Sequence, residues 1–337
     1  MEELLNFIPE MKDIFITRYE ILEFIIQEKS VGRRKIASRL FLSERIVRDE
    51  IEFLKRVDLV VVEPAGVKPT KRGIELERAL RDFYLEAASL KLLQEELKNF
   101  LGLKAVYVVR GDVSKNEEYY VNLGETCVDY IGSVAKEDDI IGVTGGRTLR
   151  EVANRARDLK LSHLMVVPAR GSLGKIPMYQ ANTVAALMAE GFKAKYNLLA
   201  VPDVVDEKTL KLLLKNEEVR EVYDLVRHID ILVFGIGRAD VMSEKRSLSK
   251  EKRDEIINLG AVGEAFGHYF DIEGKEVYSQ ESFGISKEEF LEIKDVVAVA
   301  GGCDKAEAIM SIAKLRSNMV LVTDEGLARE VLARRTK

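Results

Sequence analysis

The sequence predicts an α/β protein, with a doubly wound and mostly parallel sheet in its larger C-terminal part and a small winged helix-turn-helix at its N-terminus. From residue 104 onward, apolar runs rich in valine and isoleucine alternate with helical patterns. Such runs are typical of parallel strands that are buried on both faces. Several of the runs end in glycine-rich turns. Ahead of them, two short helical patterns joined by a tight turn precede two short strand patterns, the order of a winged helix-turn-helix.

The chain length predicts more than one domain, because 337 residues are many for a single core. We expect a winged helix-turn-helix in 1–72, a helical linker in 73–102 and the α/β domain in 103–337. No apolar run approaches the roughly 20 residues of a transmembrane helix, and the acidic start lacks the basic residues of a secretory signal.

The reactive residue types argue against a metal enzyme. Cys127 and Cys303 lie far apart without metal-ligand spacing, and the three histidines form no HExxH or comparable motif. Two isolated cysteines suit a reducing compartment. We therefore expect a cytoplasmic protein that contacts no membrane and carries no metal or cofactor.

The N-terminal region combines a helix-turn-helix pattern with positive charge. Residues 14–28 place Ile14, Ile21, Leu22 and Ile25 on one helical face, and 31–55 fit two short helices. From residue 31 to 72, 11 Lys/Arg stand against 6 Asp/Glu, a charge of +5, and since the whole chain is −5 the remainder carries −10. A basic module on an acidic body predicts that this module meets a polyanion.

A polyanion and a helix-turn-helix together predict a DNA-binding surface. The second helix starts at Ser43, a good N-cap, while the preceding turn carries Phe41 where many such motifs have glycine, so its geometry is expected to differ. The simpler interpretation of each cation is a solvated surface residue, but the module as a whole favours DNA. The expected contacts are Ser43, Glu44, Arg45 and Arg48 at the groove, Arg33 and Arg34 beside the backbone, and Lys68 and Lys71 in the wing.

Residues 73–101 hold one long helical pattern. Its apolar stripe could pack on its own domain, or it could pair two subunits, as a palindrome-binding helix-turn-helix requires; we favour the second interpretation. The stripe consists of Leu76, Leu80, Phe83, Ala87, Leu90, Leu97 and Leu101.

The C-terminal part alternates strands and helices, and in such sheets ligands bind outside the carboxyl ends of the strands. Polar and glycine-rich residues gather at these ends. Strands are expected in the stretches 105–109, 140–143, 164–171, 197–202, 229–237, 296–305 and 319–326, several of which end in polar or glycine-rich residues. The expected helices between them include 119–135, 181–190 and 207–216.

One strand ends in a glycine turn that opens a helix, an arrangement suited to a phosphate. Gly145, Gly146, Arg147 and Thr148 form this turn. Arg170 and Lys305 follow other strands and could each meet a phosphate, while Gln180 and Glu264 could bind sugar hydroxyls. Each residue alone is more often structural or superficial, but together they favour a pocket for a phosphorylated sugar, which could be a bisphosphate.

These motifs resemble those of the SorC-type sugar-responsive bacterial transcription regulators, over nearly the whole chain, and in particular of members that control central glycolytic genes. The resemblance is carried by 18–22 (RYEIL), 32–34 (GRR), 42–45 (LSER), 143–146 (VTGG), 167–171 (VPARG), 180–183 (QANT), 264–267 (EAFG), 300–302 (AGG), 305–309 (KAEAI) and 321–326 (LVTDEG).

The resemblance implies a repressor of the operon for glyceraldehyde-3-phosphate dehydrogenase and lower-glycolytic enzymes. Its effector domain would be similar to sugar-phosphate isomerases and deaminases and would bind fructose 1,6-bisphosphate or a related sugar phosphate as inducer. The family's ligand-holding motifs fall on the glycine turn, Arg170, Gln180, Glu264 and Lys305. The implied partners are operator DNA, the sugar phosphate and further copies of the chain, as a dimer and as a tetramer on DNA.

The competing class is an enzyme, a sugar-phosphate isomerase or deaminase fused to a DNA-binding head. Its chemistry needs a positioned acid or base beside the sugar. His268, Glu264, Asp304 and Asp324 are the candidates near the predicted site, and no motif marks any of them as catalytic. Fused to a DNA reader, such a domain is better explained as a sensor that kept the pocket and lost the chemistry.

Overall fold

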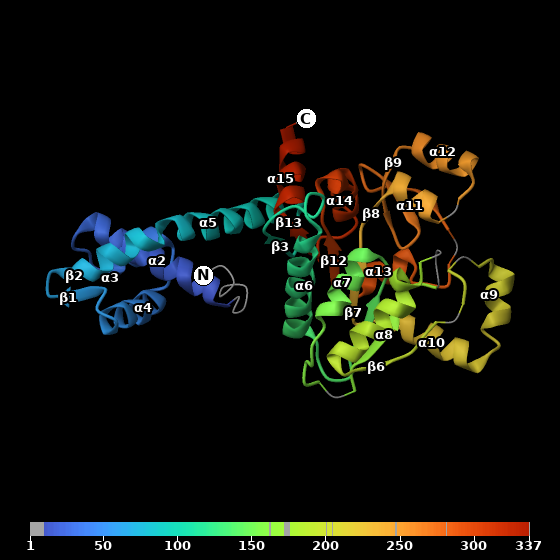
Figure 1. Cartoon of the computed structure of the whole chain (residues 1–337), viewed down its shortest axis with the longest axis horizontal. Helices are drawn as coiled ribbons and strands as arrows, with labels where there is room; N and C mark the ends of the chain where they lie inside the picture. The colour runs from blue at the N-terminus through green and yellow to red at the C-terminus, as the bar shows by residue number, and fades with distance from the viewer. Residues whose placement is uncertain are drawn as a thin grey trace. The chain divides into compact units, whose positions relative to one another are not determined.

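The computed structural model describes residues 10–161, 163–171, 176–199, 201–203, 205–246, 248–280 and 282–336. The chain folds into two compact units, Met1–Leu92 and Leu93–Lys337. Figure 1 labels the helices and strands of both units. None of the helices in the described ranges is long and apolar enough to cross a membrane.

The N-terminal unit is a winged helix-turn-helix, as predicted. Apolar positions of its helices and strands meet in one core, which includes Ile36, Val47, Ile51 and Val67. The Ser43 hydroxyl accepts a hydrogen bond from the backbone N–H of Ile46 at 3.2 Å, so it caps the second helix of the motif as expected. The elements are α2 (Glu10–Glu28), α3 (Arg33–Leu40), α4 (Glu44–Arg56), antiparallel β1 (Val60–Glu63) and β2 (Gly66–Pro69), and the start of α5 (Lys71–Leu101).

The buried face of α2 differs from the prediction at its start. Ile14 is 42% exposed, whereas Ile16 and Tyr19 are buried. The reason is a neighbour far along the chain. Tyr19 stacks on Tyr84 of α5 with ring centroids 4.1 Å apart, which fixes the rotation of the first turns of α2.

The long helix α5 confirms the predicted helix, but its stripe is buried unevenly. Leu97 is fully buried and Leu76 is 37% exposed. The side chain of Ala87 lies outside the described residues. Two leucines outside the predicted stripe, Leu85 and Leu92, are 58% and 68% exposed.

The C-terminal unit is built on a seven-stranded parallel sheet, which confirms the doubly wound fold. Apolar side chains alternate between its two faces because successive residues of a strand point to opposite sides. The strand order is β3 (Ala105–Val109), β13 (Val320–Asp324), β12 (Asp295–Ala300), β7 (Ile231–Gly235), β4 (Ile140–Val143), β5 (Met165–Pro168) and β6 (Lys195–Tyr196).

Three helices pack side by side on one face of this sheet (Figure 1). They are α6 (Tyr120–Val134), α7 (Arg147–Arg155) and α8 (Ala181–Phe192), and their apolar residues form the main core with strand residues such as Val143 and Val233. On the other face, Phe234 of β7 packs against Phe266 and against Phe290 of α13 (Lys287–Glu292), with ring centroids 4.8 and 5.7 Å apart.

The strand expected at 197–202 is wrong. The strand at this edge is the two-residue β6, and Asn197 to Leu199 lie beyond its end. Here a side chain takes the place of a strand partner: the Asn182 amide of α8 both donates to the carbonyl of Leu199 and accepts from its N–H, each at 2.9 Å.

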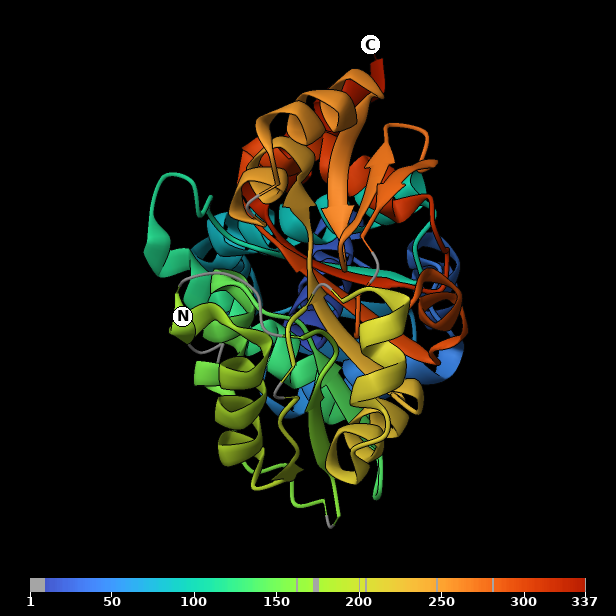
Figure 2. The same ribbon diagram turned by 90° about the vertical axis from the view of Figure 1, so that its right-hand side faces the viewer.

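A four-stranded antiparallel sheet was not predicted. Figure 2 shows it in orange at one end of the C-terminal unit, with two helices beside it. Its strand order is β11 (Glu276–Ser279), β10 (His268–Asp271), β9 (Ala261–Ala265) and β8 (Gly237–Arg238). The remaining helices are α9 (Glu207–Leu213), α10 (Glu217–Arg227), α11 (Ala239–Lys245), α12 (Lys250–Asn258), α14 (Ala306–Ala313) and α15 (Glu325–Ala333).

Candidate functional site

The predicted glycine turn lies between the carboxyl end of β4 and the N-terminus of α7. Gly146 has φ +120° and caps the helix, and a side chain there would meet nothing within 4 Å, so the turn is open on this side. At Gly145, by contrast, a Cβ atom would lie 2.4 Å from the carbonyl oxygen of Tyr179. One glycine therefore serves the backbone conformation and the other a close approach.

The turn also contacts the segment that leads into α8. The N–H of Gly146 donates to the carbonyl of Tyr179 at 2.8 Å, so this donor is already used. Gln180 follows directly and is the N-cap residue of α8. The structure therefore brings Gln180 beside the glycine turn, and the donors of the turn that remain for an anion belong to the first residues of α7.

Arg147 and Thr148 have different environments. Thr148 is 7% exposed. Arg147 forms an ion pair with Glu117, and its guanidinium lies 5.0 Å from the ring centre of Tyr120. The hydrogen bond to Glu117 raises the pKa of Arg147 and lowers the pKa of the Glu117 carboxyl. Arg147 is thus held by its own chain, and a ligand would have to compete with a carboxylate for it.

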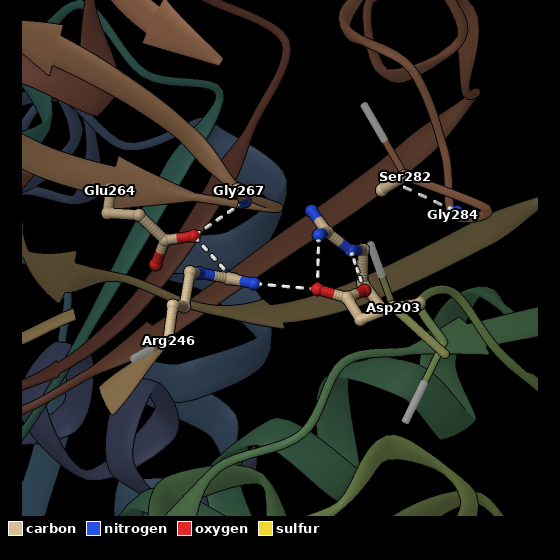
Figure 3. A network of polar contacts seen from close by, with 7 residues as sticks. Asp203, Arg246, Glu264, Gly267, Ser282 and Gly284 are labelled. Atoms are coloured by element: carbon tan, nitrogen blue, oxygen red, sulfur yellow. Dashed lines mark hydrogen bonds and ion pairs between the residues drawn. The ribbon is translucent and has the colours of Figure 1, made fainter. Parts of the chain in front are cut away.

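Asp203, Arg246 and Glu264 belong to a buried network of charged side chains (Figure 3), which Arg170 joins through Asp203. The guanidinium of Arg170 donates to both carboxylate oxygens of Asp203, from Nε at 2.7 Å and from Nη2 at 2.6 Å. Arg246 donates to the same carboxylate at 2.8 Å and to Glu264 at 2.7 Å. Glu264 also accepts from the N–H of Gly267 at 2.6 Å.

This network is almost closed to solvent, since the four charged side chains are only 2 to 6% exposed. Burial acts to lower the pKa of Arg246, but the carboxylates of Glu264 and Asp203 outweigh it, and the pKa is raised. Two donors stay without a partner among the described residues, Nη1 of Arg170 and Nε of Arg246. Unpaired buried donors are costly, so they are candidates for contact with an anionic ligand.

Two glycines, Gly267 and Gly284, pack closely against the side chain of Arg170. A Cβ atom at Gly267 would lie 2.7 Å from Nη1 of Arg170, and one at Gly284 would lie 2.5 Å from its Cδ. Figure 3 shows Ser282 and Gly284 beside this arginine network, and the Ser282 hydroxyl accepts from the N–H of Gly284 at 3.3 Å. Both glycines are therefore needed for space around the guanidinium.

Lys305 lies at the carboxyl end of β12, where it is the N-cap residue of α14. Burial lowers the pKa of its ammonium, Asp304 raises it, and the nearby Lys245 lowers it further. Within the described part of the chain, its ammonium has no ion-pair partner within 4.0 Å. Two neighbouring lysines of which one is half-buried repel each other in the absence of a ligand. Such a pair is suited to binding an anionic ligand.

Sequence reasoning missed Asp203, Lys245 and Arg246. Asp203 follows the apolar run at 197–202, where the expected strand does not form, and the two cations come at the end of α11. A neighbouring Lys-Arg pair is the only sequence signal there, and it looks the same as a solvated helix end.

Two acid and base candidates of the competing enzyme class, Asp324 and His268, have partners within the fold. Asp324 accepts hydrogen bonds from the N–H groups of Val113 and Gly302 and holds the turn after β12. Burial raises the pKa of Asp324 and lowers the pKa of His268, whose Nδ1 lies 3.3 Å from Glu276. Among the described residues, no group of three His, Cys, Asp or Glu could hold a metal ion.

A surface cavity of about 450 Å³ lies on the small sheet but does not include the predicted ligand residues. Its charged lining is paired internally: Arg238 binds Asp240 and Asp304, and Arg334 binds Glu307. We therefore do not assign it a charged ligand.

The predicted DNA-binding residues form an exposed surface on the N-terminal unit. Arg34 and Arg45 have side chains 90% and 85% exposed, and their neighbours Glu44 and Asp49 lie 3.8 and 4.0 Å away. The wing cation Lys68 pairs with Glu63, and Lys71 lies 4.0 Å from Glu75. Exposed pairs of this kind are weak, so the cations can exchange their carboxylates for phosphates.

Two family models match the chain. The model described as "Putative sugar-binding domain" matches residues 86–333, and the model described as "CggR N-terminal DNA binding domain" matches residues 14–84.

Relatives and solved structures match over most of their length. The central glycolytic genes regulators of Bacillus subtilis and Priestia megaterium are each 36% identical, over 96% of this chain and 96% of theirs. The crystal structure of a SorC family transcriptional regulator from Enterococcus faecalis is similar with a TM-score of 0.68 and 33% identity, covering 72% of this chain and 99% of that one. The full-length sorbitol operon regulator SorC from Klebsiella pneumoniae shares the fold, with a TM-score of 0.67 and 18% identity over 90% of this chain and 94% of that one.

Proposed function

The chain belongs to the SorC family of sugar-binding transcriptional regulators, and from this premise we propose that it is a repressor of central glycolytic genes induced by a sugar phosphate. The observation that carries the proposal is the 36% identity to two central glycolytic genes regulators along 96% of the chain. Its relatives at this level are regulators with a DNA-binding domain, so the chain is a regulator rather than an enzyme. By the same analogy, its target would be the operon for glyceraldehyde-3-phosphate dehydrogenase.

We propose fructose 1,6-bisphosphate as the inducer, because the site offers two separate groups of cations. In the first, Arg170 and Arg246 would bind one phosphate through their unpaired donors, Nη1 and Nε. In the second, Lys305 and Lys245 would bind the other phosphate with the help of the α7 N-terminus. Gln180 and Glu264 would contact the sugar between them. A related sugar phosphate with one phosphate would use only one group.

The proposed mechanism is a shift between two arrangements of the oligomer. A dimer, joined into a tetramer on the operator, would place two helix-turn-helix heads on half-sites, with residues 73–102 as the helical linker. The sugar phosphate would bind better to the arrangement that holds the heads in worse register. By linkage, the operator and the inducer must then weaken each other's affinity by the same factor.

The test is a calorimetric titration of the whole protein with fructose 1,6-bisphosphate. Wild type should bind, and Arg170→Ala, Arg246→Ala and Lys305→Ala should each lose most of the affinity. Arg220→Ala, which removes an exposed cation of α10, is the matched control and should bind as wild type. If fructose 6-phosphate binds and fructose 1,6-bisphosphate does not, the inducer is a monophosphate. If no sugar phosphate gives a heat of binding, the proposed effector site is refuted.

The regulatory part is tested with the same ligand and an operator duplex. Saturating ligand should weaken operator binding, and the presence of the duplex should weaken ligand binding equally. If ligand leaves both the affinity and the cooperativity of operator binding unchanged, the chain is not a sugar-phosphate-controlled repressor.

A further inference from the structure

Phe41 is the most exposed large apolar side chain among the described residues, at 92%. It lies in the turn between α3 and α4, with its backbone in the left-handed region at φ +54°. This conformation is unfavourable for every residue with a Cβ atom, and glycine adopts it freely. An aromatic residue here therefore combines an exposed ring with a strained backbone.

The fold explains the backbone of Phe41 but not its ring. The N–H groups of Phe41 and Leu42 both donate to the carbonyl of Ala37, which closes α3 and sets the turn. A glycine would make the same hydrogen bonds. The ring of Phe41 is not part of the core of the N-terminal unit, whereas the next residue, Leu42, packs against the edge of that core. A group that covers the ring would therefore come from outside the core of the N-terminal unit.

The surroundings of Phe41 favour DNA as that partner. Arg39 in the last turn of α3 and Arg45 in the first turn of α4 flank it in the chain, and they outnumber Glu44, the one acidic residue of that first turn. Ser43 caps α4, so the positive end of a 13-residue helix begins two residues after the ring. A second apolar residue, Ile46, is 44% exposed in the same first turn. A protein partner would meet this density of cations less favourably than a nucleic acid.

We propose that Phe41 and Ile46 are DNA contacts. Ile46 enters the major groove with the start of α4 and packs against a thymine methyl group, the apolar feature that the groove offers. Phe41, outside the groove, packs its ring on a deoxyribose of the flanking backbone and so fixes the depth of the helix. This inference rests on the proposed DNA-binding role of the N-terminal unit and adds apolar contacts to the cations expected there.

Apolar contacts leave a distinct signature in the salt dependence of binding. Each cation that neutralises a phosphate releases counterions, so its removal lowers the slope of log K against log salt by about one. An apolar contact releases none. Loss of Phe41 should therefore weaken binding without changing that slope, whereas loss of Arg34, expected beside the DNA backbone, should change it.

The experiment measures binding of the full chain by fluorescence anisotropy over a range of KCl concentrations. One duplex is selected from random DNA by the wild-type protein, and the other has the same composition in scrambled order. Phe41→Gly should bind both duplexes roughly tenfold more weakly, about 1.4 kcal/mol, with an unchanged salt slope. Ile46→Ala should weaken binding to the selected duplex alone, because only there does a thymine methyl lie in place.

Folding controls accompany these variants. Phe41→Gly should unfold at the wild-type temperature or above it, because glycine relieves the left-handed backbone. Phe41→Asn, which also tolerates this conformation, should bind like the glycine variant. Leu291→Ala, which truncates a 45% exposed leucine in the C-terminal unit, should leave both affinities unchanged.

Three results would overturn the inference. Wild-type affinity in Phe41→Gly would mean that the ring meets no DNA. A changed oligomeric state in light scattering, accompanied by the loss of DNA binding, would mean that the ring meets a second copy of the chain. Failure of the wild-type protein to bind any duplex would refute the proposed DNA-binding role itself, together with this inference.

Discussion

At the scale of one residue, the surroundings of Lys305 predict that the proposed effector site lowers the stability of the fold. Its ammonium is half-buried, and burial lowers its pKa below the 10.5 that is ordinary for lysine. Lys245 lowers the pKa further, while Asp304 partly opposes the shift. A lysine whose pKa falls on folding is a destabilising group at neutral pH, because the folded state binds its proton less tightly than the unfolded chain does.

We expect Lys305→Met to be more stable than wild type at pH 7, by a few degrees in Tm, and to lose sugar-phosphate binding. The difference in Tm between Lys305→Met and wild type should depend on pH. The destabilisation by Lys305 is fully present below its folded pKa and disappears as the pH rises from that value toward 10.5. Thermal unfolding of both proteins at several pH values between about 7 and 10 measures this difference, which should narrow.

A matched control is Lys314→Met, which removes an exposed lysine paired with Glu273. It should leave the unfolding temperature nearly unchanged at each pH, because exposed pairs contribute little. A Lys305→Met protein that unfolds at a lower temperature than wild type would show that the ammonium has a structural partner.

The candidate site was predictable where a residue follows a strand directly. Arg170 and Lys305 come after long apolar runs, and the carboxyl ends of parallel strands meet at one edge of the sheet. Asp203 follows an apolar run but was not singled out, and Arg246 was not predictable because it follows the end of a helix, α11. Their pairing with Arg170 and Glu264 depends on the path of the chain in space, and no local pattern encodes it.

At the scale of elements, the contact between α5 and the edge strand β3 links the linker helix to the sheet. The Gln94 side chain accepts a hydrogen bond from the N–H of Val108 at 2.9 Å, which satisfies a donor of an edge strand. The segment after β3 contains Val113, whose N–H donates to the carboxylate of Asp324. The same carboxylate accepts from the N–H of Gly302, which lies beside Lys305. Hydrogen bonds therefore connect the region of α5 with the proposed effector site.

We expect Gln94→Ala to keep the affinity for sugar phosphate but to change how strongly that ligand weakens DNA binding, by about 0.5–2 kcal/mol of coupling. The loss of one hydrogen bond should lower the free energy of unfolding by about 1 kcal/mol. Gln94→Glu keeps an acceptor for Val108 and is the control. The measurement is operator affinity with and without saturating ligand, for all three proteins. Equal coupling in all three would show that the signal leaves the effector domain elsewhere.

Apolar runs predicted their strands well, because a strand that is buried on both faces of a sheet is apolar at nearly every position. β3, β4, β7, β12 and β13 lie where the sequence indicated. The small antiparallel sheet was missed because its strands mix polar with apolar residues, whereas β3 and β4, which are about as short, are apolar throughout. The strand expected at 197–202 failed for another reason, the side chain of Asn182 that takes the partner's place at Leu199.

At the scale of the whole molecule, one winged helix-turn-helix per chain is insufficient for a two-fold symmetric operator. We therefore expect the protein to self-associate on such an operator, and residues 73–102 stay our predicted oligomerisation segment. Within this helix, Leu85 and Leu92 are 58% and 68% exposed. They stand seven residues apart, a spacing that places both side chains on one seam of a coiled coil.

We expect the double substitution Leu85→Lys and Leu92→Lys to dissociate the oligomer. Each buried leucine contributes about 1.5–3 kcal/mol, and like charges placed on a two-fold seam repel each other. Operator binding should weaken strongly and lose cooperativity, because each head would then bind its half-site alone, while sugar-phosphate affinity per subunit should stay close to wild type. Light scattering gives the mass, and anisotropy and calorimetry give the two affinities. Leu212→Lys, at a 63% exposed leucine of α9, is the matched control. If the double variant keeps the wild-type mass, α5 is not the oligomer seam, and the coupling of inducer to operator must run through contacts between effector domains.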